Sequence, residues 1–153
     1  MTDSHLSDSD LSDDVRAGQS VYSPRVLRTY DLLVLGFSNR FIWKCPTKRL
    51  LALYNENVTD NHLDVGVGTG YFLDHCGFPA EAPRVALLDL NENCLQQTAE
   101  RIERYRPELL QANLLESIPY DGERFNSIGM NYVLHCLPGD LSTKAAAFDH
   151  LQH

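Results

Sequence analysis

The stretch His62–Asp74, which reads HLDVGVGTGYFLD, decides the fold of this 153-residue chain. Residues that favour strands alternate in its first half with residues that do not, and a glycine stands at every second position of the part that follows. Such a run predicts a short buried strand and then a tight loop, over which a ligand can approach the backbone closely. The next residues, up to Cys76, are compatible with a short helix. The strand formers are Leu63, Val65 and Val67, and the glycines are Gly66, Gly68 and Gly70.

The spacing of the glycines departs from the dinucleotide fingerprint Gly-x-Gly-x-x-Gly. The third glycine, Gly70, comes one residue early, and Tyr71 stands where the fingerprint has glycine. An acid, Asp64, lies two residues before the first glycine, and a second acid, Asp89, follows 25 positions later at the end of an apolar run. A carboxylate there can accept both hydrogen bonds of a ribose diol. The loop and the two acids together predict a nucleoside site.

Strand and helix patterns alternate along the rest of the chain. Further strands are expected over residues 84–89, 108–112 and 125–131, and helices follow from Asn91 and from Asp140 or Ser142. This alternation predicts an α/β fold with a parallel sheet, in which ligands bind beyond the carboxyl ends of the strands. An earlier helix is expected from near Pro46. Its apolar side would consist of Leu50, Leu51, Leu53 and Tyr54.

The Asp-x-Gly-x-Gly-x-Gly pattern, the acid that ends the second strand and the strand ends at Asn113 and Asn131 have a parallel in a known family. Over roughly residues 63–137 the chain resembles the class I S-adenosylmethionine-dependent methyltransferases. The resemblance implies a doubly wound Rossmann-like parallel sheet with about four of the usual seven strands, in the order 3-2-1-4, and with N-terminal helices before it. It also implies S-adenosyl-L-methionine as cofactor, and the low basic charge of the chain favours a small molecule over nucleic acid as methyl acceptor.

The resemblance assigns cofactor contacts by position. The glycines would face the methionine part, and Asp64 would hold its amino group directly or through water. Asp89 would bind the ribose hydroxyls, with Leu90 packed on the adenine. Asn113, where the family commonly has Asp, would meet the adenine amino group. The full set is Asp64, Gly66, Gly68, Gly70, Asp89, Leu90, Asn113, Leu114, Asn131 and Tyr132.

Substrate contacts are expected from helices ahead of the first strand, which often cover the ligand cleft in this family. The candidates are Tyr22, Tyr30, Arg40 and Trp43, although Tyr30 and Trp43 can equally be core residues. No catalytic residue is assigned. His135 is the one nearby candidate for a general base, and the competing interpretation is a structural histidine. Cys136 is expected to pack in the interior.

Composition changes divide the chain into three segments. Residues 1–20 are rich in Ser and Asp and are expected to form a disordered acidic tail. Residues 21–61 would form a helical lid region, and residues 62–153 the N-terminal part of the cofactor-binding domain. If only four strands are present, the fourth is an exposed sheet edge. A homodimer or a missing C-terminal segment would then cover it.

Charge and cysteine content exclude several partners. A net charge of −8 argues against a nucleic-acid surface, which needs a basic stripe. No apolar run approaches the roughly 20 residues that span a bilayer. No secretory signal is expected from the residues at the start of the sequence, and the four cysteines are scattered without a Cys-x-x-Cys pair. Buried reduced thiols in a cytoplasmic protein are therefore expected, and a metal site is not.

Three functions remain open from the sequence. The first is a methyltransferase that acts on a small molecule. The second is a non-catalytic, truncated methyltransferase-like module that binds a cofactor or a partner protein. The third is an NAD(P)-dependent oxidoreductase, which the glycine loop and Asp89 support and which Tyr71 disfavours.

Overall fold

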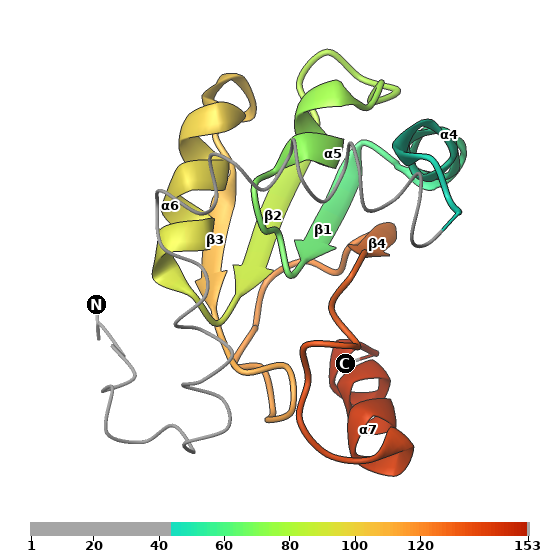
Figure 1. The fold of residues 1–153 in the computed structure, drawn as a ribbon. Helices are drawn as coiled ribbons and strands as arrows, with labels where there is room; N and C mark the ends of the chain where they lie inside the picture. Colours follow the sequence, from blue (N-terminus) through green and yellow to red (C-terminus); the bar gives the residue numbers. More distant parts are fainter. Residues whose placement is uncertain (1–43, 153) are drawn as a thin grey trace.

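The four expected strands form one parallel sheet in the computed structural model, which describes residues 44–152 (Figure 1). The strand order is β3-β2-β1-β4, and every neighbouring pair is parallel. This arrangement confirms the order implied by the resemblance. The strands are β1 (Asn61–Val65), β2 (Arg84–Asp89), β3 (Glu108–Gln111) and β4 (Ser127–Met130).

The two central strands are buried on both faces, which explains why they read as nearly continuous apolar runs. Along β2, Val85 and Leu87 belong to one core cluster, while Ala86 and Leu88 belong to the other. In the register of the sheet, Ala86 pairs with Leu63 of β1. The alternation of side chains therefore supplies two cores, one on each face of the sheet.

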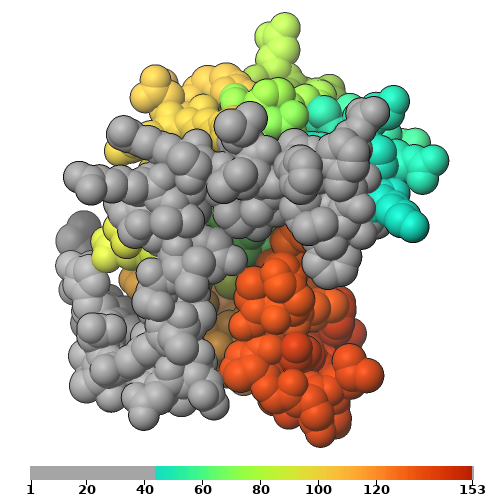
Figure 2. Space-filling view, viewed as in Figure 1, coloured from blue at the N-terminus to red at the C-terminus, as the bar shows by residue number. Residues whose placement is uncertain are grey.

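Helices cover both faces and make a three-layer fold (Figure 1). Side chains of α4 (Thr47–Asn57), α5 (Tyr71–His75) and α6 (Glu92–Arg101) pack in the core of one face. On the other face, Ala147 of α7 (Leu141–Leu151) packs in the second core. Figure 2 shows α7 and the loop before it as one lobe on the visible surface. A short 3₁₀ helix, η2 (Glu103–Tyr105), leads from α6 toward β3.

Side-chain caps begin the two longer helices after β2, as the sequence predicts. The side chain of Asn91 accepts a hydrogen bond from the Asn93 N–H at 2.9 Å at the start of α6. Asp140 accepts from the Thr143 N–H at 2.9 Å at the start of α7. Each cap satisfies a helical N–H that has no partner within its own helix.

Two expectations about burial are wrong. Leu53, assigned to the apolar side of α4, is 54% exposed, because α4 turns its neighbour Tyr54 toward the sheet instead. Cys136 is exposed rather than packed in the interior. None of the four cysteines forms a disulfide. The expected edge does occur at β4, where the side chain of Ile128 is 43% exposed.

The expected acidic tail, residues 1–20, and residues 21–43 of the expected lid region lie outside the described residues, whereas residues 44–61 of that region are described and contain α4. Within residues 44–152, every helix is too short or too polar to cross a membrane.

Candidate functional site

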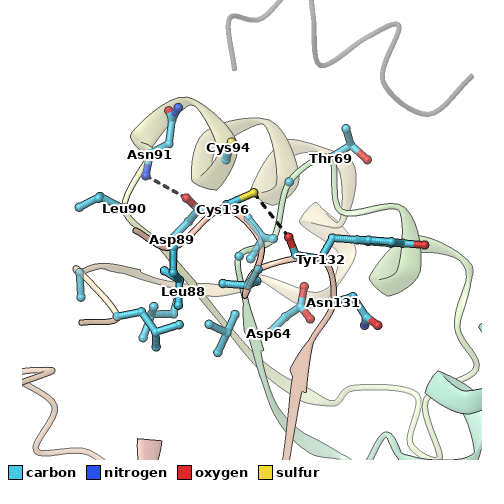
Figure 3. A pocket seen from close by; sticks show the side chains of 18 of the residues that line it. Asp64, Thr69, Leu88, Asp89, Leu90, Asn91, Cys94, Asn131, Tyr132 and Cys136 are labelled. Carbon is cyan, nitrogen blue, oxygen red and sulfur yellow. Dashed lines mark hydrogen bonds between the residues drawn. The ribbon is translucent and has the colours of Figure 1, made fainter. Parts of the chain in front are cut away.

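A cleft opens at the carboxyl ends of β1, β2 and β4 (Figure 3). Four segments line it: the glycine loop, the turn after β2, residues 112–114 and residues 131–138. The sheet brings these strand ends to one edge, as expected for an open parallel sheet. The predicted cofactor residues that line the cleft are Asp64, Gly66, Gly68, Asp89, Leu90, Asn113, Leu114, Asn131 and Tyr132.

The three loop glycines have positive φ angles but different surroundings. A methyl group on Gly66 would collide with the Val133 side chain, and one on Gly70 would collide with Thr98. No atom lies within 4 Å of the place where a Gly68 methyl group would be. Gly68 therefore faces open space in the cleft. Gly70, the one predicted cofactor contact that does not line the cleft, lies against Thr98 of α6 instead.

Asp89 anchors the glycine loop from the end of β2. Its carboxylate accepts the Asn91 N–H at 2.9 Å (Figure 3), and the backbone N–H groups of Gly68, Val67 and Leu90 lie close enough to act on its pKa. Burial raises the pKa of Asp89 to about 6, and these N–H donors act in the opposite direction. The loop amides of Val67 and Gly68 thus lie near a carboxylate of the chain itself.

Asp64 lies at the end of β1 and is 7% exposed. The hydroxyl of Tyr54, from α4, donates a hydrogen bond to its Oδ1 atom. Burial raises the pKa of Asp64 to about 7; the Tyr54 hydrogen bond lowers it, and the nearby Asp89 carboxylate raises it further. His62 also approaches, with Nε2 at 4.0 Å from Oδ1, and its own burial lowers the His62 pKa to about 4.

The charge of the cleft is one-sided. Asp64 and Asp89 both line it, and within residues 44–152 its lining contains neither lysine nor arginine. Two half-buried to buried carboxylates favour a ligand that carries positive charge and hydroxyl groups, and they repel a diphosphate. In the described residues no group of three or more His, Cys, Asp or Glu side chains could hold a metal ion.

Aromatic rings form one wall of the cleft. Phe72 stacks on Tyr54 with ring centroids 5.4 Å apart, and Tyr132 stacks on Phe72 at 6.5 Å. Tyr132 has φ +60°, a conformation uncommon for a residue with a side chain. Strained residues of this kind cluster at functional sites. The strain here directs the segment after β4 across the glycine loop, where Val133 meets Gly66.

The remaining predicted site residues differ in where they lie. Asn113 lines the cleft as predicted. The Asn113 amide bonds within its own turn, accepting from the Leu115 N–H at 3.1 Å and donating to Glu116 at 2.6 Å. His135 is exposed, does not line the cleft, and lies 3.3 Å from the Cys136 sulfur. Tyr22, Tyr30, Arg40 and Trp43 lie outside the described residues.

The structure adds residues that the sequence analysis does not assign to the site. Tyr54 does not line the cleft, but the packing of α4 brings its hydroxyl to Asp64, which does. A tyrosine on a buried helix face needs a partner for its hydroxyl, and this need is a signal that the sequence carries. Cys136 lines the cleft and donates a hydrogen bond to the Tyr132 carbonyl at 3.6 Å (Figure 3). Further lining residues are Thr69, Tyr71, Asn91, Cys94, Val133, Leu137 and Pro138.

Comparison with known families and proteins gives a consistent result. Residues 63–152 match the family described as "Methyltransferase domain". The chain is 38% identical over 149 residues to demethylluteothin O-methyltransferase of Streptomyces thioluteus, covering 97% of this chain and 63% of that protein. It is 39% identical over 137 residues to the physcion biosynthesis cluster O-methyltransferase of Aspergillus chevalieri, covering 88% of this chain and 61% of that protein. The chain thus spans less than two thirds of the length of these relatives.

A solved structure shares the fold. The N-methyltransferase NodS from Bradyrhizobium japonicum WM9, in complex with S-adenosyl-L-homocysteine, matches with a TM-score of 0.61 at 16% sequence identity. The match covers 92% of this chain and 66% of that one. At this identity, the likeness concerns the fold.

Proposed function

This chain belongs to the class I S-adenosylmethionine-dependent methyltransferases, and we propose that it transfers a methyl group from S-adenosylmethionine to a small-molecule acceptor. The family match over residues 63–152 supports the reaction class. The names of the O-methyltransferase relatives support a small molecule as the acceptor. When bound, S-adenosylmethionine supplies an electrophilic methyl carbon on its sulfonium.

The one-sided charge of the cleft is the observation that carries this proposal. The cofactor has a positive sulfonium, a positive ammonium and a ribose diol. Asp64 and Asp89 line the cleft at the ends of neighbouring strands, with no lysine or arginine among the described lining residues. The donor set therefore fits a cationic nucleoside, and the open space at Gly68 leaves room for it against the backbone.

In this proposal the cleft residues divide by chemistry. Asp64 holds the ammonium of the methionine part, and Asp89 accepts the ribose hydroxyls while it anchors the glycine loop. Leu90 and Leu114 enclose the adenine, and Asn113 meets its amino group from a turn that already fixes its side chain. Gly66, Gly68, Asn131 and Tyr132 enclose the methionine part, and Gly70 supports the loop from behind.

Methyl transfer asks the protein mainly to place the acceptor in line with the sulfonium. We therefore assign no general base. His135 is exposed and does not line the cleft, so the proposal does not use it. Residues 21–61 are proposed to cover the acceptor side of the cleft. The position of α4, which lies within this range, supports this role because α4 brings Tyr54 to Asp64.

The oxidoreductase alternative is disfavoured by how the loop amides are used. A dinucleotide site directs them at a pyrophosphate. Here the Val67 and Gly68 N–H groups lie near the Asp89 carboxyl, and both residues line a cleft with two carboxylates. A pyrophosphate would meet repulsion rather than donors.

The partner and the compartment are also part of the proposal. A net charge of −8 suits a small-molecule acceptor better than nucleic acid. The four cysteines are outside disulfides, which supports a reducing compartment such as the cytoplasm. Because exposed sheet edges are usually covered, we propose that another polypeptide segment, such as a second copy of the chain, covers the β4 edge.

The test is calorimetric titration of the folded chain with S-adenosylhomocysteine and, separately, with NADH. We expect micromolar binding of the first and no binding of the second. Asp89→Ala should abolish binding, while Asp121→Ala, which removes an exposed acid outside the cleft, should leave it unchanged. A folded chain that binds NADH, or neither ligand, would overturn the proposal.

A further inference from the structure

Tyr54 connects the helix before the sheet to the cleft. It is the buried residue of α4, at 6% exposure, and its hydroxyl donates to Asp64 Oδ1. Its ring is held from two sides, by the stack on Phe72 and by the edge of the His62 ring at 5.6 Å. These two contacts restrict the orientation of the Tyr54 ring, so its hydroxyl is held toward Asp64 Oδ1.

The sheet leaves space for this contact. On β4, a methyl group at Gly129 would come 2.5 Å from the Tyr54 hydroxyl oxygen and 2.9 Å from Asp64 Oδ1. Glycine at this position is required because any larger residue would occupy the site of the hydrogen bond. The Asn131 side chain, two residues on, lies close enough to the Tyr54 hydroxyl to lower the Tyr54 pKa. Residues from α4, β1 and β4 therefore converge on one pair.

A second donor approaches the same carboxylate oxygen. His62 is 2% exposed, its Nδ1 lies 2.8 Å from Ser127 Oγ, and its Nε2 has no hydrogen-bond partner. Nε2 lies 4.0 Å from Asp64 Oδ1. If Ser127 donates to Nδ1, the ring proton is on Nε2 and faces the carboxylate, whereas the other tautomer would face a lone pair toward it. The first arrangement is the favourable one.

We propose that Tyr54 is a positioning residue for cofactor binding: its hydroxyl fixes Oδ1 of Asp64, with His62 behind, and leaves Oδ2 for the ammonium of S-adenosylmethionine. This inference rests on the proposed function. Oδ2 receives no hydrogen bond from residues 44–152, and Asp64 lines the cleft. Restricting one oxygen orients the other, so the ligand does not have to order the carboxylate when it binds.

The hydrogen bond also affects when Asp64 is ionised. The titratable groups that face it are Tyr54, His62, Asp89 and the Cys76 thiol. Burial raises the pKa of Asp64, and the Tyr54 hydrogen bond lowers it. Since an ammonium binds the ionised carboxylate, affinity should fall as pH drops through this pKa. Without the hydroxyl, the pKa rises and the fall begins at higher pH.

The experiment is a double-mutant cycle on the full 153-residue chain, read by calorimetric titration with S-adenosylhomocysteine from pH 6 to 9. Tyr54→Phe keeps the ring stack and removes only the hydroxyl. We expect about tenfold weaker binding at pH 8 and an acidic midpoint displaced to higher pH. In an Asp64→Asn background the same change should alter the dissociation constant less than about twofold, because the partner carboxylate is gone.

Tyr105→Phe is the matched control, since Tyr105 does not line the cleft and packs on Phe78 instead. It should leave the dissociation constant and the pH midpoint unchanged. If the wild-type chain binds and Tyr54→Phe binds equally at every pH, or weakens binding equally with and without the Asp64 carboxylate, this inference fails alone. If the folded wild-type chain does not bind S-adenosylhomocysteine, the proposed function fails with it.

Discussion

Gly70 lies so close to Thr98 that a methyl group on Gly70 would come within 2.7 Å of the Thr98 methyl carbon. The hydroxyl of the same threonine donates to the Gly68 carbonyl at 3.3 Å. Thr98 belongs to α6 and is completely buried. The helix that follows β2 therefore supports the loop that follows β1, both through a close contact and through a hydrogen bond.

Two loop glycines should separate stability from binding. Gly70→Ala combines a positive φ with the Thr98 collision and should cost about 2–4 kcal/mol of unfolding free energy. Gly68→Ala has the φ strain but no collision and should cost about 1–2 kcal/mol. Its methyl group points into open cleft space, so binding of S-adenosylhomocysteine should weaken at least about tenfold.

Urea denaturation and calorimetric titration measure the two effects. Gly77→Ala is the control, because Gly77 has neither a positive φ nor a neighbour within 4 Å. It should change neither quantity appreciably. A Gly68→Ala variant that binds as tightly as wild type would show that the cofactor does not pass over this residue.

Asp64→Asn should stabilise the chain at neutral and alkaline pH. The folded-state pKa of Asp64 is about 7, above the unfolded value of about 3.9. The stability that this carboxyl contributes is therefore present below about pH 4 and is lost as pH rises through 7. Asparagine does not ionise, so the variant should be more stable than wild type at pH 8 by about 1–3 kcal/mol.

Denaturation curves at several pH values give the difference between the two proteins. His62 titrates in the opposite sense, because its pKa is lowered to about 4, but it is present in both proteins and largely cancels. The difference should shrink to near zero at pH 4. A gap that widens toward acid would contradict the assignment.

Arg101 should stiffen the glycine loop. Its Nη1 donates to the Thr69 carbonyl at 3.0 Å, and its Nε donates to Asp74 at 3.1 Å. A lysine ammonium cannot hold both acceptors in this fork geometry. Arg101→Lys should therefore lower stability by about 1 kcal/mol and speed hydrogen exchange of the loop amides. The exposed Arg49→Lys should do neither, and an equal effect from it would rule out the clamp.

The exposed edge of the sheet should promote self-association. Ile128 lies on β4, one of the two edge strands of the described sheet, which pairs with β1 on one side only, and its side chain is 43% exposed. Ile128→Lys should place a charge there and reduce concentration-dependent association in sedimentation velocity. Leu53→Lys changes a similarly exposed residue on α4 and should have no such effect. If both variants associated to the same extent, self-association would not depend on the β4 edge.

Prediction from the sequence was most accurate for strands that are buried on both faces of the sheet, because such strands are continuous runs of apolar residues. β2 matches the expected range at both ends, since every residue of its interior is apolar. β4 is shorter than expected because only Ser127–Met130 pairs with β1. On α4 the periodicity could not tell which of Leu53 and Tyr54 faces the sheet, since adjacent residues lie on different sides of a helix and tertiary packing chooses between them.

The cleft residues follow the same rule. Strand-end residues such as Asp89 could be placed from the sequence, because parallel topology gathers strand ends at one edge. The contact between Tyr54 and Asp64 could not, because it depends on how α4 packs. The internal turn of Asn113 was likewise hidden, since an Asn side chain can bond its own backbone or a ligand with equal ease.

The exposure of Cys136 on the wall of the cleft has a practical consequence. A thiol there is a built-in reporter of occupancy, because a bound ligand would shield it from alkylating reagents. Half-buried Cys45, which does not line the cleft, supplies an internal reference in the same peptide digest. The ratio of the Cys136 labelling rate to the Cys45 labelling rate, measured by mass spectrometry, would report whether a candidate ligand occupies the cleft. This screen does not require the methyl acceptor to be known.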